Sequence, residues 1–150
     1  MRLKTVGSVE IDRPIEKVFY YTNENVAEWS LTVVEDEPLE RKNAGGVGST
    51  FRCVTEDQGR RMEFLGEVTK WEPPALSEVL LIGKQFNIEA EYQFEDLGGR
   101  TRVTQTSFVK PNGIVMNVMF LVMSPFMKKS SCDAVQKELD SLKVHAEAQL

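Results

Sequence analysis

The sequence predicts an α+β fold in which a seven-stranded antiparallel sheet is covered by one long C-terminal helix. Three observations predict it. Residues 31–110 alternate between strand-like runs and turn clusters, the period becomes helical after residue 113, and two short helical segments follow the first strand. The predicted element order is β-α-α-β6-α. A chain of 150 residues has the length of one domain, so we assign residues 1–150 to a single domain.

The first strand and the two short helices are indicated by period and capping. Apolar or small side chains occupy every second position of residues 3–11, which is the period of a strand. Pro14 suits the first position of a helix because the amide proton it lacks would have no partner there. We therefore expect a helix over residues 14–21 and a second one from residue 23 or 24 to Trp29.

Six further strands form the predicted meander. Clusters rich in glycine, proline, asparagine and aspartate separate them, as in sheets whose strands are joined by tight turns. The clearest strand is 86–94, where five apolar residues alternate with four polar ones. We therefore expect one face of this strand to be buried and the other to be solvent-exposed. The expected ranges are 31–41, 47–55, 61–71, 76–82, 85–95 and 100–109.

The C-terminal region is predicted to form two consecutive helical segments, Ile114–Met123 and Phe126 to about Ala148. Between them lies Ser124-Pro125, a good helix start with serine as N-cap and proline at N1. One straight helix would be about 50 Å long at 1.5 Å per residue, whereas a domain of this size is about 38 Å across. Apolar residues at spacings of three and four give the second segment one buried stripe: Cys132, Val135, Leu139, Leu142 and Ala146.

Charge and composition argue against several classes of partner. The net charge is −5 and no run of Lys or Arg exceeds two residues, so we expect neither nucleic-acid binding nor general attraction to anionic lipid. The longest apolar run, Ile114–Met123, is shorter than the roughly 20 residues that cross a bilayer, so we predict no integral membrane segment. No signal peptide is apparent, and Cys53 and Cys132 lie far apart, which indicates reduced thiols and a cytoplasmic location.

No residue pattern predicts catalysis. His145, the single histidine, falls on a charged stretch and is interpreted as a solvated helix residue. One histidine and two distant cysteines do not make a metal site, so we predict no metal, no cofactor and no catalytic residue. The acidic run of residues 35–37 is interpreted as a solvated strand edge.

A set of mainly apolar residues is predicted to line a ligand site. Alternation places aromatic and aliphatic side chains on one sheet face, with polar groups of Tyr92, Gln105 and Ser107 to orient a ligand. Met116, Met119, Met123 and Met127 are spaced by three and four, as on one helical face, and could form a deformable wall. Two alternatives stay open: these side chains fill a core, or the helical segment is an exposed contact surface. The predicted ligand-binding residues are Phe51, Cys53, Met62, Phe64, Phe86, Ile88, Tyr92, Gln105, Ser107, Met116, Met119, Phe120 and Met123.

Five segments, in this order, resemble the START-like superfamily, also called the SRPBCC or polyketide cyclase/dehydrase-like group. They span nearly the whole chain. The resemblance implies the helix-grip fold, in which a curved sheet wraps around the C-terminal helix and leaves a deep cavity. Relatives carry lipids, sterols, plant hormones, polyketides or quinones, and some catalyse cyclisation or dehydration. The segments are residues 9–19 (VEIDRPIEKVF), Trp29, residues 46–51 (GVGSTF), residues 99–104 (GRTRVT) and residues 139–147.

Three functions follow as hypotheses. The first is non-enzymatic binding or carriage of a small hydrophobic molecule of lipid, polyketide or aromatic type. The second is a polyketide cyclase or dehydratase-like enzyme, which would need an acid or base facing the cavity. The third is an interaction module that uses the Met-rich segment 114–127 to contact a protein or a membrane surface. A homodimer also stays open.

Overall fold

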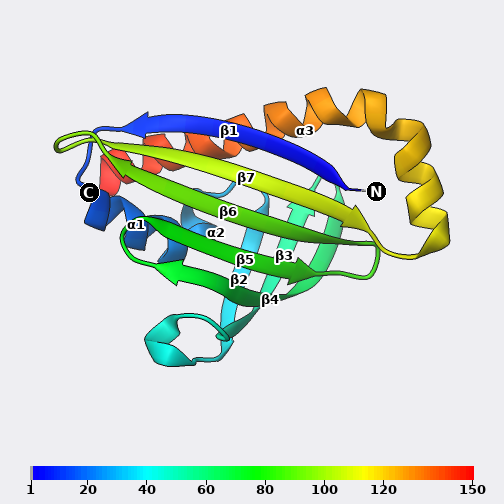
Figure 1. Ribbon diagram of the computed structural model, residues 1–150, viewed down its shortest axis with the longest axis horizontal. Helices are drawn as coiled ribbons and strands as arrows, with labels where there is room; N and C mark the ends of the chain where they lie inside the picture. The colour runs from blue at the N-terminus through cyan, green and yellow to red at the C-terminus, as the bar shows by residue number, and fades with distance from the viewer. Residues whose placement is uncertain (1) are drawn as a thin grey trace.

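Residues 2–150 are described by the computed structural model, and they form one seven-stranded antiparallel sheet with a long C-terminal helix (Figure 1). The predicted fold class is therefore confirmed. The sheet order is β1-β7-β6-β5-β4-β3-β2, so the meander runs from β2 to β7 and β1 closes the far edge against β7. The strands are β1 Leu3–Ile11, β2 Val33–Glu40, β3 Thr50–Asp57, β4 Arg60–Glu72, β5 Leu76–Ile82, β6 Phe86–Asp96 and β7 Thr101–Pro111.

The two short helices differ slightly from their predicted bounds. Helix α1 spans Ile15–Glu24 rather than ending near residue 21, and α2 spans only Val26–Trp29. In the last turns of α1, Thr22 Oγ1 donates to the carbonyl of Val18 at 2.7 Å and Asn23 Nδ2 donates to the carbonyl of Phe19 at 2.8 Å. A short 3₁₀ turn, η1, covers Asn43–Gly45 between β2 and β3.

The predicted break at Ser124-Pro125 is wrong. Helix α3 runs without interruption over Gly113–Gln149, with Pro125 inside it. Pro125 cannot donate to the carbonyl of Leu121, but the Ser124 hydroxyl donates to that carbonyl at 3.4 Å. The helix also bends, since its first part runs at a steep angle to the rest in Figure 1. A straight helix of this length would extend beyond the domain, and the bend allows the continuous helix to fit.

The main core lies at one end of the sheet, where α1, α2 and the end of α3 meet. Leu139 and Leu142 of α3 are fully buried there, as the predicted stripe required. Trp29 is also buried and donates from Nε1 to the carbonyl of Thr22 at 3.0 Å. The buried cluster consists of Ile11, Val18, Phe19, Tyr21, Trp29, Phe94, Val103, Leu139, Leu142 and Ala146.

Helix α3 lies directly against the sheet at Gly7 in the middle of β1. A Cβ atom at this position would lie 2.9 Å from Val135 Cγ1 and 3.1 Å from Leu139 Cδ1. Side-chain contacts this short are repulsive, so only glycine allows the helix to lie at this distance from β1. Gly7 thereby sets the spacing between the sheet and the C-terminal half of α3.

We predict that Gly7→Ala lowers the free energy of unfolding by about 1–3 kcal/mol, because the added methyl group must displace the side chains of α3. Val6→Ala is the control, since Val6 is about half exposed on the opposite face, and its effect should stay below about 1 kcal/mol. Urea unfolding of both variants measures the difference. Equal stabilities of the two variants would show that the contact is not tight.

Candidate functional site

Strand pairing defines which side chains face α3. Directly opposed residues of antiparallel strands point to the same face of a sheet. Gly7, which contacts α3, is opposite Gln105, Gln105 is opposite Tyr92, and Tyr92 is opposite Ser77. This row therefore lies on the inner face, and so do residues two positions away along each strand. By the same register, Phe51 lies opposite Gly66 and Cys53 opposite Phe64 on this face.

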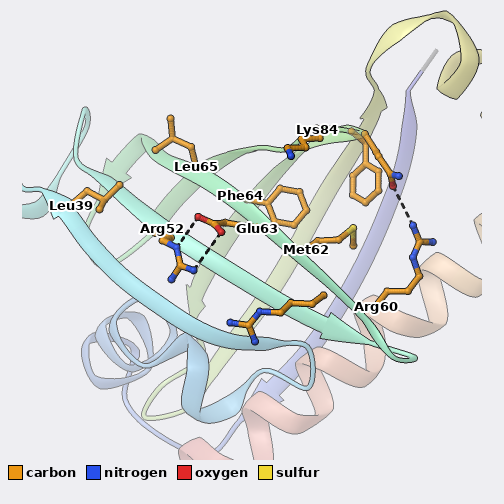
Figure 2. Close-up of a pocket in the computed structure, with 12 residues that line it drawn as sticks. Leu39, Arg52, Arg60, Met62, Glu63, Phe64, Leu65 and Lys84 are labelled. Carbon is orange, nitrogen blue, oxygen red and sulfur yellow. Dashed lines mark hydrogen bonds and ion pairs between the residues drawn. The ribbon is translucent and has the colours of Figure 1, made fainter.

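A cleft of about 850 Å³ opens at the end of the sheet away from the core. Strand β4 pairs with β5 only from Leu65 onward, so residues 60–64 have β3 as a neighbour on one side and the β5–β6 turn across a gap on the other. We call this opening the β4–β5 cleft (Figure 2). Its lining consists of Leu39, Arg52, Arg60, Arg61, Met62, Glu63, Phe64, Leu65, Gly83, Lys84, Gln85 and Phe86.

The inner part of the β4–β5 cleft is aromatic. The ring centroids of Phe64 and Phe86 are 5.9 Å apart, and those of Phe86 and the buried Phe120 of α3 are 6.4 Å apart. A Cβ atom at Gly83 would lie 2.6 Å from the Phe64 ring, so this glycine leaves space for the ring beside the turn. Met62 completes this part of the lining. Three of the predicted ligand-binding residues thus line one cleft, and a fourth lies against it.

The rim of the β4–β5 cleft is charged. Arg52 Nε donates to Glu63 Oε1 at 2.7 Å on the outer face, and the Arg60 guanidinium donates to Gln85 Oε1 at 3.2 Å across the gap (Figure 2). Lys84 lies in the turn beside them. An apolar interior with a polar rim suits a molecule that buries a hydrophobic body and leaves a polar end near water.

Polar groups lie on the inner face beyond the lining of the β4–β5 cleft, in the row of Ser77, Tyr92 and Gln105, which we call the inner polar row. Gln105 Nε2 donates to Ser107 Oγ at 3.1 Å. The buried Gln105 Oε1 and Ser77 Oγ have no hydrogen-bond partner among residues 2–150. Burial raises the pKa of the Tyr92 hydroxyl, and the nearby Glu138 and Cys53 raise it further, so Tyr92 stays a protonated donor at neutral pH. The row therefore offers both donors and acceptors to a buried polar group.

Asp36 faces the interior, although the sequence indicated a solvated strand edge. It lies opposite Cys53 in the β2–β3 pair and is only partly exposed, and burial raises the pKa of its carboxyl group. Register shifts on both sides, between Val33 and Glu35 and between Pro38 and Glu40, disturb the simple alternation of β2. No regular period in the sequence could therefore have assigned Asp36 to the inner face.

Two further titratable groups accompany Asp36. Burial, reinforced by the Asp36 carboxylate, raises the pKa of the Cys53 thiol to about 12, so Cys53 is a thiol and a poor nucleophile at neutral pH. Glu138 of α3 accepts hydrogen bonds from Ser30 Oγ at 2.6 Å and the Leu31 amide at 2.9 Å. Burial still raises the pKa of Glu138 above its ordinary value. Sequence reasoning missed Glu138 because it lies beside the apolar stripe of α3, where solvated residues are common.

The helical part of the predicted site is only partly assembled. Met116 is half-buried, whereas Met119 and Met123 are 52% and 48% exposed, so they do not reach the β4–β5 cleft. The reason is that Phe120 occupies the inward side of this part of α3, in contact with Phe86. The predicted methionine wall is thus incorrect for Met119 and Met123.

His145 is half-buried, and its Nδ1 lies 2.9 Å from the carbonyl oxygen of Ser141 in the same helix.

Comparison with known proteins identifies similar chains. The model of the family described as polyketide cyclase / dehydrase and lipid transport matches residues 2–147. A START superfamily protein from Mycobacterium smegmatis is 18% identical, with a TM-score of 0.80 and coverage of 99% of both chains. A protein from Thermus thermophilus is 18% identical, with a TM-score of 0.79 and 97% coverage of both.

A third solved structure, the Zhui aromatase/cyclase from Streptomyces, is 13% identical, with a TM-score of 0.73 and coverage of 99% of this chain and 96% of that one. At these identities the likeness concerns the fold alone, and it confirms the predicted helix-grip architecture. No curated protein sequence matches the chain.

We predict that Asp36→Asn raises the melting temperature by a few degrees at pH 7. Because the folded-state pKa of Asp36 lies above its ordinary value of 3.8, stability is lost as the pH rises from about 3.8 through the folded-state pKa. Asparagine carries no charge, so the variant avoids this loss. The two proteins should melt at the same temperature below about pH 3.8, where Asp36 is protonated in both states.

Glu37→Gln is the matched control for this prediction. Glu37 is exposed and lies 3.8 Å from the Arg52 guanidinium, so its neutralisation should not stabilise the protein at pH 7. Thermal melts across pH 3–8 measure both variants. A gain in the control equal to that of Asp36→Asn would mean that net charge, not burial, is responsible.

Proposed function

This chain belongs to the polyketide cyclase / dehydrase and lipid transport family, and we propose that it binds and carries a small hydrophobic molecule between the sheet and α3. The observation that carries the proposal is the β4–β5 cleft, whose aromatic interior continues to Phe120. The proposed contacts are the predicted residues on the inner face of the sheet or on the inward side of α3: Phe51, Cys53, Met62, Phe64, Phe86, Ile88, Tyr92, Gln105, Ser107, Met116 and Phe120.

Apolar burial supplies the proposed affinity. Removing about 200 Å² of ligand surface from water contributes about 5 kcal/mol at 25 cal/mol per Å². The phenylalanine rings beside the cleft already pack against one another at tilted angles, so little side-chain freedom is lost when a ligand binds. A volume of about 850 Å³ lies in the range of small-molecule sites.

A second candidate function, ring closure or dehydration of a polyketide-like substrate, is favoured by the titratable groups near the inner polar row. Aldol ring closure requires a base that removes a proton beside a carbonyl and an acid that protonates the carbonyl oxygen. In this proposal the Tyr92 hydroxyl, kept protonated by its raised pKa, is the acid, and the neighbouring Glu138 carboxylate, made more basic by burial, is the base.

We predict that Met62→Trp weakens binding of the fluorescent apolar probe N-phenyl-1-naphthylamine at least tenfold, because indole fills the β4–β5 cleft. Met119→Trp is the matched control, since it adds the same group to an exposed position of α3 and should leave probe affinity unchanged. Fluorescence titration measures both. Unchanged affinity in Met62→Trp, with the fold intact by circular dichroism, would refute binding in the cleft.

The enzyme candidate makes a separate prediction. Tyr92→Phe and Glu138→Gln should each reduce conversion of a linear poly-β-ketone thioester to its cyclic product at least a hundredfold, with probe binding retained, because each change removes one proton-transfer group. Chromatography of the products measures the rate. If the unaltered protein does not accelerate cyclisation, or if Tyr92→Phe retains full rate, the catalytic candidate fails and the carrier proposal stands.

A further inference from the structure

The first part of α3 exposes an unusual amount of apolar surface. Eight large hydrophobic side chains between residues 114 and 126 are between 48% and 83% exposed. Exposed apolar residues are common singly, but a contiguous group of this kind marks a contact site. The group, which we call the apolar segment, consists of Ile114, Val115, Val118, Met119, Leu121, Val122, Met123 and Phe126.

The apolar segment is too broad for a narrow helix–helix contact. At about 100° per residue, its side chains cover an arc of roughly 200° around α3. The opposite side of the helix carries Met116, Phe120 and Met127, which are buried or half-buried. A coiled-coil partner covers a stripe about half as wide, whereas the surface of a bilayer can take up a wide arc along the whole segment.

The charges around the apolar segment are basic. No charged residue occurs from position 111 to 127, and the segment is bounded by Lys110 on one side and Lys128 and Lys129 on the other. Arg2 and Lys110 line a small surface pocket in which Glu89 is the acidic member. In Figure 1 the start of β1 lies at the same end of the sheet as the start of α3. The local charge thus differs in sign from the net charge of −5, which had argued against anionic lipid.

We propose that the apolar segment docks the protein onto the surface of an anionic lipid bilayer. Among residues 2–150 no helix is long and apolar enough to cross a membrane, so the segment would lie in the interfacial layer, with the lysines at its ends against lipid headgroups. The inner side of the same part of α3 bears Phe120, in contact with the Phe86 ring of the β4–β5 cleft. Docking therefore brings the cleft close to the bilayer.

The test is co-sedimentation of the full chain with vesicles of phosphatidylcholine containing 30% phosphatidylglycerol, compared with phosphatidylcholine alone. The unaltered protein should bind the anionic vesicles, and the double variant Leu121→Asp/Phe126→Asp should lose at least tenfold in affinity. Lys128→Gln/Lys129→Gln should lose about twenty-fivefold on anionic vesicles, about fivefold per lysine, from about 1 kcal/mol per basic residue near the surface. Val144→Asp is the matched control, since Val144 is 65% exposed on the far half of the same helix.

Three results would overturn the proposal. They are absence of binding to anionic vesicles, full binding by the Leu121→Asp/Phe126→Asp variant, and equal loss in Val144→Asp. Light scattering without lipid tests whether a second copy of this chain covers the apolar segment instead. A dimer that Leu121→Asp/Phe126→Asp converts to a monomer would assign the segment to that dimer contact. Met62→Trp should still bind vesicles, so failure of the cleft proposal and failure of the docking proposal are distinguishable.

Discussion

The fold depends on the contact between the C-terminal half of α3 and strand β1 at Gly7. Because this residue has no side chain, Val135 and Leu139 lie directly against the strand, and Leu142 is drawn into the core with α1 and α2. The helix is thus held firmly at one end of the sheet. Towards the other end it bends, and its inner contact there is the pairing of Phe120 with Phe86. A cleft can open at that end because the core does not extend to it.

The inner face changes in character along its length. Near the cleft it is aromatic, whereas beyond the cleft lining it carries the hydroxyl and amide groups of Ser77 and Gln105. Burial also raises the pKa values of Tyr92 and Glu138 there. Buried polar atoms without partners are costly, so they are expected where a ligand or water completes their hydrogen bonds. This arrangement suits a molecule with an apolar body and at least one hydroxyl or carbonyl group. The same groups that would orient such a ligand could also transfer protons, which is why carrier and cyclase are closely related proposals.

The spacing of apolar residues along the sequence predicted most of the architecture. Where the predictions were wrong, the physical cause can be identified. The two-residue period of 86–94 matched β6 closely, because its apolar side chains share the inner face, where Ala90 and Phe94 are buried. The continuity of α3 could not be predicted, since a serine followed by a proline is also a good helix start; in the structure Pro125 lies inside the helix and the Ser124 hydroxyl contacts the carbonyl of Leu121. The position of Asp36 depends on irregular pairing in β2, which alternation cannot reveal. Met62, Phe64 and Phe86, which line the cleft, could be assigned to the inner face because apolar alternation is a direct signature of such a face.

The most direct test of ligand binding in the β4–β5 cleft is a methyl NMR titration of the protein labelled at its methionine methyl groups, using a small apolar ligand such as naphthalene. The six methionines include Met62 in the cleft and Met119 and Met123 on the outer side of α3. Binding in the cleft predicts a saturable shift of the Met62 resonance with little change at Met119 and Met123. Shifts confined to Met119 and Met123, or no saturable shift at any methionine, would contradict it.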